Sequence, residues 1–131
     1  MMKKLNFFLK NGNLRGRVLS DSCPSRRILR HLTSRWGILV LVTLYTGTKR
    51  FGELRREIEG ISERMLTQTL QNLEQDGMVY RHDFDSMPPH VEYSLTNFGK
   101  QAAEHLNTLV DWLEENMEEI LAESRQHART L

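Results

Sequence analysis

The sequence predicts a mainly α-helical fold with one small β-hairpin, in a winged helix-turn-helix arrangement. A short amphipathic helix, a glycine-containing turn and a longer helix follow one another in residues 50–77, which is the order of a helix-turn-helix. Two short extended segments come next and form the expected wing, and one long amphipathic helix, expected to serve dimerisation, follows them. A chain of 131 residues suits one domain with one core.

Composition and charge limit the class of protein. A single cysteine excludes an internal disulfide framework, and no apolar run is long enough to span a bilayer, so we expect a cytoplasmic protein with no membrane association. Ten Lys and Arg but only two acids lie between Arg15 and Arg56, whereas seven acids and no Lys or Arg lie between Glu104 and Glu123. This separation favours a polyanionic partner for the basic part, although ordinary solubilising charge is the alternative.

The ends of the chain differ in pattern from its middle. Residues 1–22 have poor periodicity and a turn signal at residues 11–13, and we expect them to form a flexible N-terminal arm. The folded DNA-binding and dimerisation domain is expected to cover residues 23–123, with a C-terminal tail at 124–131.

Two helices open the expected domain. Pro24 suits the first turn of a helix because its missing N–H would have no partner there, and the helix continues to Leu32 with arginines outside. Residues 36–46 are apolar on nearly every side, and they are too few to span a membrane. They therefore predict a buried central helix that ends at Gly47.

The helix expected at residues 62–76 has a signal at each end. Ser62 is a good N-cap, and Gly77 can adopt the left-handed conformation that closes a helix. An apolar stripe of leucines faces inward, and the opposite face carries long or hydroxylated side chains that suit base edges in a major groove. The alternative is an ordinary solvated face. The expected base contacts are Arg64, Thr67, Gln68 and Gln71.

The shorter helix of the pair is expected at residues 50–58, with Phe51, Leu54 and Ile58 inward. In a helix-turn-helix the second helix enters the major groove and the first crosses the phosphate backbone. The expected phosphate contacts are Arg50, Arg55, Arg56, Ser62 and Arg81.

The wing is expected to pair residues 78–82 with residues 91–95 across a proline-containing loop. Asp83 and Asp85 make its tip acidic, so we expect modest contacts between the wing and DNA. His82 and His90 are expected to face each other near the hairpin end. The histidines lack the spacing of a metal site, so we expect neither a metal nor another cofactor.

The last helix is expected to run to about Ala122, with an apolar seam at spacings of four and three that begins at Phe98 and Ala102. A seam of this length favours a homodimer, because a second helix would fill it. The alternative is packing on its own domain, through Phe98 and Ala102 only. The expected dimer interface consists of Leu106, Leu109, Leu113, Met117 and Ile120.

Cys23 has two interpretations. At the start of a helix near Arg26 and Arg27, its thiolate would be favoured, and an exposed thiolate could be oxidised, alkylated or paired with the same cysteine across a dimer. Alternatively it is a small buried hydrophobic residue at the dimer junction.

A series of short motifs runs in order along most of the chain. They are Cys23-Pro24, Ser34-Arg35-Trp36, Arg50-Phe51-Gly52-Glu53-Leu54, Gly60-Ile61-Ser62, Met65-Leu66-Thr67-Gln68, Leu73-Glu74-Gln75-Asp76-Gly77 and Pro88-Pro89-His90-Val91-Glu92-Tyr93-Ser94-Leu95-Thr96. Over residues 23–120 the sequence resembles the HxlR-type transcriptional regulators. The resemblance implies a dimeric, bacterial, DNA-binding protein with dimer contacts through its first and last helices. Some relatives sense electrophiles or oxidants through a cysteine that matches Cys23.

These observations favour a sequence-specific transcriptional regulator that binds a palindromic operator in double-stranded DNA as a homodimer. A redox signal at Cys23 or a small molecule is the expected kind of effector. The alternative is a winged-helix module that binds proteins and not DNA. We expect no enzymatic activity, because the sequence has no catalytic constellation.

Overall fold

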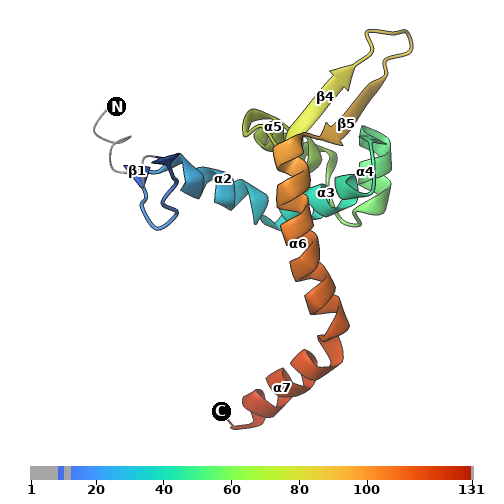
Figure 1. Ribbon diagram of the computed structural model, residues 1–131. Helices are drawn as coiled ribbons and strands as arrows, with labels where there is room; N and C mark the ends of the chain where they lie inside the picture. The colour runs from blue at the N-terminus through green and yellow to red at the C-terminus, as the bar shows by residue number, and fades with distance from the viewer. Residues whose placement is uncertain (1–8, 11–12, 131) are drawn as a thin grey trace.

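The computed structural model describes residues 9–10 and 13–130 (Figure 1). Its helices are α2 (Pro24–Leu32), α3 (Arg35–Tyr45), α4 (Phe51–Glu57), α5 (Glu63–Gln75), α6 (Asn97–Glu115) and α7 (Met117–Thr130). Its strands are β1 (Leu9–Lys10), β2 (Asn13–Leu14), β3 (Lys49–Arg50), β4 (Val79–Asp83) and β5 (Val91–Leu95). The central helices and the wing form a body from which α2 extends on one side and α6 and α7 on another. The predicted mainly helical fold with a small antiparallel sheet is confirmed.

The core is built around α3, whose Val40 and Leu41 are fully buried. Leu54 of α4 and Leu66 of α5 are also fully buried, so the two helices of the helix-turn-helix pack on this same core. Helix α3 is central as predicted, but only one of its sides is buried, because Leu39 and Tyr45 are exposed. The leucines on the inner face of α5 hold that helix against the core. The buried cluster comprises Val40, Leu41, Leu44, Leu54, Ile58, Ile61, Leu66, Leu70, Leu73, Val79, Leu95 and Ala103.

The wing contains one strand more than predicted. Strand β3 pairs with β5, which gives an antiparallel sheet in the order β3-β5-β4. A two-residue strand whose partner lies some forty residues away leaves no local periodicity to detect.

The expected pairing of the two wing histidines is wrong. His82 lies opposite Glu92, and the Phe84 ring contacts both imidazoles, with centroid distances of 4.2 Å to His82 and 4.4 Å to His90. The register places His90 just beyond the paired residues, because Asp83 and Val91 form the last pair.

Helix α6 starts on the turn that follows α5, and its inner face differs from the prediction. The Thr96 hydroxyl caps the helix by accepting from the Gly99 N–H at 3.0 Å, as expected. Gly99 and Ala103 are the buried residues of this helix, whereas Phe98 is 70% exposed. The alternative of packing through Phe98 and Ala102 is therefore wrong, because small residues one position later allow the closest approach. Leu106, expected at the dimer interface, packs against its own core.

The expected single C-terminal helix is two helices separated at Asn116. The Asn116 side chain donates from Nδ2 to the Trp112 carbonyl at 2.8 Å, a local bond that competes with regular helix. Helix α7 then runs to Thr130, so the expected end of the helix near Ala122 is wrong, and the residues expected as a tail from 124 onward are helical as far as Thr130. Good helix formers continue beyond Ala122. Helix α7 also has acids in its first turn and His127 and Arg129 in its last turn, which suits the helix dipole.

The part of the expected N-terminal arm that the structure describes contains local structure. Strand β1 pairs with β2, and Leu9 lies opposite Leu14. Nearer the domain, the Arg26 guanidinium donates to the Val18 carbonyl at 3.1 Å and to the Leu19 carbonyl at 2.8 Å. These bonds fasten residues 18–19 to the first turn of α2. For residues 1–8 and 11–12, the expectation of a flexible arm lies outside the described residues.

Candidate nucleic-acid interface

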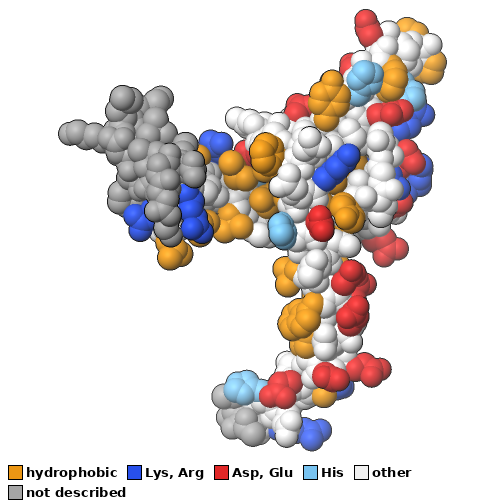
Figure 2. Space-filling view, in the orientation of Figure 1, with side chains coloured by type: hydrophobic (Ala, Val, Ile, Leu, Met, Phe, Trp, Pro, Cys, Tyr) orange, Lys and Arg blue, Asp and Glu red, His pale blue; other side chains and the backbone are white. Residues whose placement is uncertain are grey.

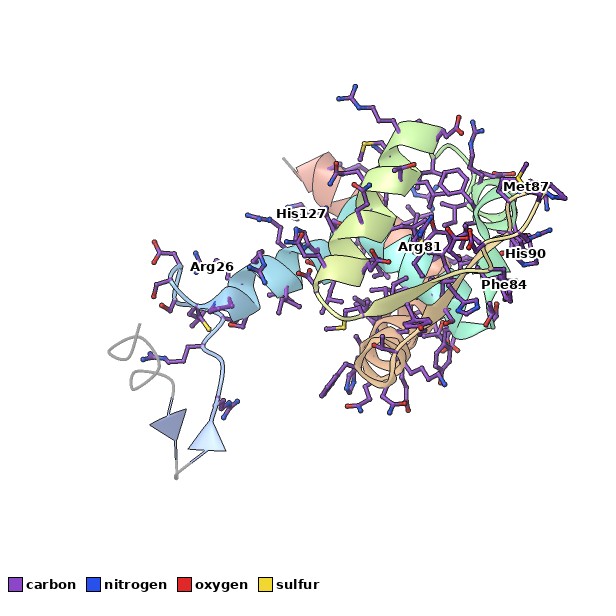
Figure 3. All side chains as sticks on the ribbon, turned by 90° about the horizontal axis from the view of Figure 1, so that it is seen from above. Arg26, Arg81, Phe84, Met87, His90 and His127 are labelled. Atoms are coloured by element: carbon purple, nitrogen blue, oxygen red, sulfur yellow. The ribbon has the colours of Figure 1, made fainter. Side chains whose placement is uncertain are left out.

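Helix α5 is closed at both ends by the residues that the sequence indicates. The Ser62 hydroxyl accepts from the Met65 N–H at 3.0 Å, and Gly77 has a φ of 78°. The capped helix lies on the outside of the body, where no other element of the described chain crosses it in Figure 3. Its direction is fixed by the core beneath it and its outer surface is left to solvent.

The four expected base-reading side chains are all exposed on α5: Arg64, Thr67, Gln68 and Gln71. The Thr67 hydroxyl donates to the Glu63 carbonyl at 2.9 Å, so its oxygen is left to accept. The Gln68 amide donates to Asn72 Oδ1 at 3.1 Å, and it keeps a second N–H and its carbonyl oxygen for a ligand. Asn72 is not among the residues predicted from the sequence, although its spacing of four from Gln68 is a signal for such a pair.

The expected phosphate contacts come from three places around α5. Arg55 and Arg56 are exposed in the last turn of α4, and Arg50 is exposed directly before α4. The Ser62 cap uses an acceptor of its hydroxyl and leaves the hydroxyl hydrogen free to donate. Arg81 is on the wing, between the body and the tip that carries Phe84 and Met87 (Figure 3).

The sheet register separates two of these arginines. Arg50 lies opposite Glu92, whereas Arg81 lies opposite Tyr93. Neighbouring residues of a strand point to opposite faces, so Arg50 and Arg81 lie on different faces of the sheet. Asp83 Oδ2 is also 3.8 Å from Nη2 of Arg81 and partly offsets its charge. The two arginines therefore cannot grip one phosphate together.

The exposed acids of the C-terminal helices are grouped on the surface. Figure 2 shows acidic side chains along one side of α6, with hydrophobic side chains along the other. Helices α4 and α5 lie at the opposite end of the subunit from α7 (Figure 1). The helix-turn-helix and the wing carry acids as well as arginines, so charge is mixed there, whereas the acidic side of α6 repels a polyanion.

The hydrophobic side of α6 and α7 is not covered by the described chain. Leu109 is 51% exposed, Leu113 43% and Met117 38%, and Trp112 and Leu121 are also exposed. Exposed apolar groups at helical spacing along two successive helices are typical of a surface that a partner covers. Of the expected interface residues, Ile120 and Leu106 are half-buried, and Leu106 packs against the core of its own subunit.

Cys23 is the N-cap residue of α2, and the residue is 5% exposed. The Ser25 hydroxyl donates to Sγ at 3.0 Å and the Arg17 N–H donates to it at 3.3 Å. These bonds favour the thiolate and hold the pKa of Cys23 below its ordinary value, while desolvation acts in the opposite direction. The site combines both interpretations of the sequence, because the thiol is buried and also polarised.

Neither a metal site nor a membrane-spanning helix is found in the part of the chain that the structure describes. In residues 9–10 and 13–130, no group of three or more His, Cys, Asp or Glu side chains is placed to hold a metal ion. Among the same residues, no helix is both long and apolar enough to cross a membrane.

A capped, exposed helix, a shorter helix before it and a β-hairpin after it define a winged helix-turn-helix protein of the transcriptional regulator class. The model of the HxlR-like helix-turn-helix family matches residues 31–121, and the chain belongs to this family. It is 54% identical over 114 residues to the uncharacterized HTH-type transcriptional regulator YtfH of Escherichia coli (strain K12). The matched region covers 87% of each chain.

Solved structures agree with this assignment. The structure of ytfH from Salmonella typhimurium is 50% identical, with a TM-score of 0.80, over 85% of this chain and 99% of that one. The redox regulator HypR in its reduced form is 35% identical, with a TM-score of 0.69, over 76% of this chain and 98% of that one. The resemblance stated from the sequence is confirmed.

Proposed function

We propose that this protein binds a palindromic operator in double-stranded DNA as a homodimer, with α5 of each subunit in the major groove. The observation that carries the proposal is the outer face of α5, which is polar, exposed and held by a helix capped at both ends. A regulator that acts on chromosomal DNA works in the cytoplasm, and the activity is binding and not catalysis.

The residues divide into two roles. Gln68 and Gln71 present amides that can bond adenine in two places, and Arg64 suits guanine. Thr67 adds an acceptor and a methyl group. Arg55 and Arg56 lie at the end of α4, which crosses the backbone in this geometry, and they neutralise phosphates together with Arg50 and Arg81. Ser62 donates a hydrogen bond to a phosphate oxygen.

Dimerisation gives the operator its symmetry. Two α5 helices related by a two-fold axis reach successive major grooves when they lie about 34 Å apart. The exposed hydrophobic side of α6 and α7 supports this arrangement, since a second copy would cover it with the same surface.

The base and phosphate roles predict different losses. We expect Gln68→Ala to cost about 1–3 kcal/mol on the preferred base and to relax preference at that position only. We expect Arg55→Ala to weaken all duplexes alike and to lower the log–log salt slope by about 1. Selection from a random duplex pool, followed by anisotropy titrations at several salt concentrations, measures both effects.

Two exposed residues outside the helix-turn-helix and the wing provide matched controls. Gln101→Ala on α6 and Arg125→Ala on α7 remove the same side chains and should leave affinity and specificity unchanged. If the wild type enriched no sequence from the pool, the DNA-binding proposal would fail and a protein-binding winged helix would be the better interpretation.

We further propose that Cys23 makes DNA binding responsive to oxidants or electrophiles. The solved relative HypR is described as a redox regulator, which supports this proposal. With hydrogen peroxide, the thiolate attacks one oxygen, an S–O bond forms, and the O–O bond breaks with release of hydroxide. The polar group that results cannot keep the buried position of Sγ between Arg17 and Ser25 without moving them.

The thiolate character of Cys23 can be tested directly. Ser25→Ala removes the hydrogen bond that contributes most to the low pKa, so we expect the pH midpoint of Cys23 alkylation by iodoacetamide to rise. The control is Ser22→Ala, whose hydroxyl bonds Ser20 and not the thiol. Equal midpoints in the wild type and Ser25→Ala would refute this account. Unchanged operator affinity after peroxide or quinone treatment of the wild type, relative to Cys23→Ser, would refute the sensing role.

A further inference from the structure

Asp76, which follows the last residue of α5, is a buried acid that the proposed DNA contacts do not use. Its side chain is 1% exposed. It is the C-cap of α5, where its N–H bonds the Asn72 carbonyl. A negative charge is unfavourable at this end of a helix, because the macrodipole is negative there. Neither capping nor the dipole explains a buried carboxylate at this position.

Both partners of this carboxylate come from α2. Nδ1 of His31 is in hydrogen-bond contact with Oδ2 of Asp76. A carboxylate can only accept a hydrogen bond, so Nδ1 carries the hydrogen and donates it. Nε of Arg27 lies 3.7 Å from Oδ1. Oδ1 is buried and has no hydrogen-bond partner among the described residues. His31 and Arg27 are four residues apart, so one face of α2 holds the acid from both sides.

Helix α2 is also held at its C-terminal end, where the Ser34 hydroxyl before α3 donates to the His31 carbonyl at 2.9 Å. None of its residues is fully buried, and among them Leu32 packs at the margin of the core. A buried carboxylate that loses its partners is strongly disfavoured, so separation of α2 from the end of α5 would leave Asp76 unpaired. The positions of α2 and α5 are therefore linked through Asp76.

We propose that Asp76 is a positioning residue that sets α2 and the recognition helix α5 relative to each other through His31 and Arg27. The proposal rests on the DNA-binding function proposed above. Because Asp76 joins the end of α5 to α2, a displacement of α2 changes how α5 is presented to DNA. Helix α2 begins directly after Cys23. The linkage requires no contact between Asp76 and DNA.

A double-mutant cycle tests the linkage. We expect Asp76→Ala and His31→Ala each to lower operator affinity by roughly threefold to thirtyfold, with no loss of dimer. The double variant should lose little more than either single variant, since all three lack the same contact. Glu74→Ala is the control, because Glu74 is exposed at the same end of α5. Losses that simply add, or unchanged affinity with only a lower melting temperature, would overturn the proposal.

Amide hydrogen exchange separates this proposal from the DNA-binding proposal. In the absence of DNA, Asp76→Ala and His31→Ala should each raise exchange in both α2 and the last turn of α5. Exchange that rises only in the helix that carries the substitution would refute the linkage whether or not the protein binds DNA. If Asp76→Ala does not fold, Arg27→Ala and His31→Ala on the half-exposed α2 give the same comparison.

Discussion

Replacing Gly99 by alanine is expected to lower the free energy of unfolding by about 3 kcal/mol or more. A Cβ at this position would lie 1.9 Å from the Met78 carbonyl oxygen and 2.9 Å from its carbon. Both atoms belong to the backbone, so relief requires α6 to move away from the turn that follows α5. Urea denaturation should show a lower midpoint at an unchanged m-value.

Gly52→Ala is the matched control for this prediction. Gly52 is also in a helix, but a Cβ there would meet only the end of the Arg56 side chain, at 3.6 Å. Alanine should then change stability by less than about 1 kcal/mol and in the favourable direction, because it has the higher helix propensity. Equal midpoints for the two variants would mean that α6 does not approach Met78 this closely.

Leu113→Asp is expected to dissociate the proposed dimer and to reduce operator affinity by about a hundredfold or more. Leu113 lies among exposed apolar groups on α6, so a carboxylate there would be buried without a partner when two copies associate. The loss of operator affinity is large because a monomer contacts only one half-site, whereas a dimer contacts both. Light scattering coupled to gel filtration measures the mass, and anisotropy measures the affinity.

Thr108→Asp provides the control for charge. Thr108 is exposed on the same helix, and its position is about 140° around the axis from Leu113. The substitution adds the same charge to the acidic side, and we expect a dimer with nearly unchanged affinity. A dimeric Leu113→Asp protein would refute the proposed interface.

Local signals explain which parts of the fold could be predicted from the sequence. Both ends of α5 were predicted correctly, because Ser62 and Gly77 act on their immediate neighbours. The wing strands were also predicted, since alternation and a proline-containing loop lie within twenty residues.

Non-local packing explains the misses. Strand β3 depends on a partner distant in sequence. The buried side of α6 is marked by Gly99 and Ala103, and a search for hydrophobic periodicity passes over such small residues. The bond between His31 and Asp76 spans 45 positions, and neither residue stands out in the sequence. Features created by tertiary contact were thus the ones that the sequence did not indicate.

The acids along one side of α6 also affect how DNA approaches the molecule. No Lys or Arg lies between Glu104 and Glu123, so a duplex that approaches this side is repelled. Approach in that orientation is disfavoured before any atoms touch, and the effect weakens as salt is added because ions screen the repulsion.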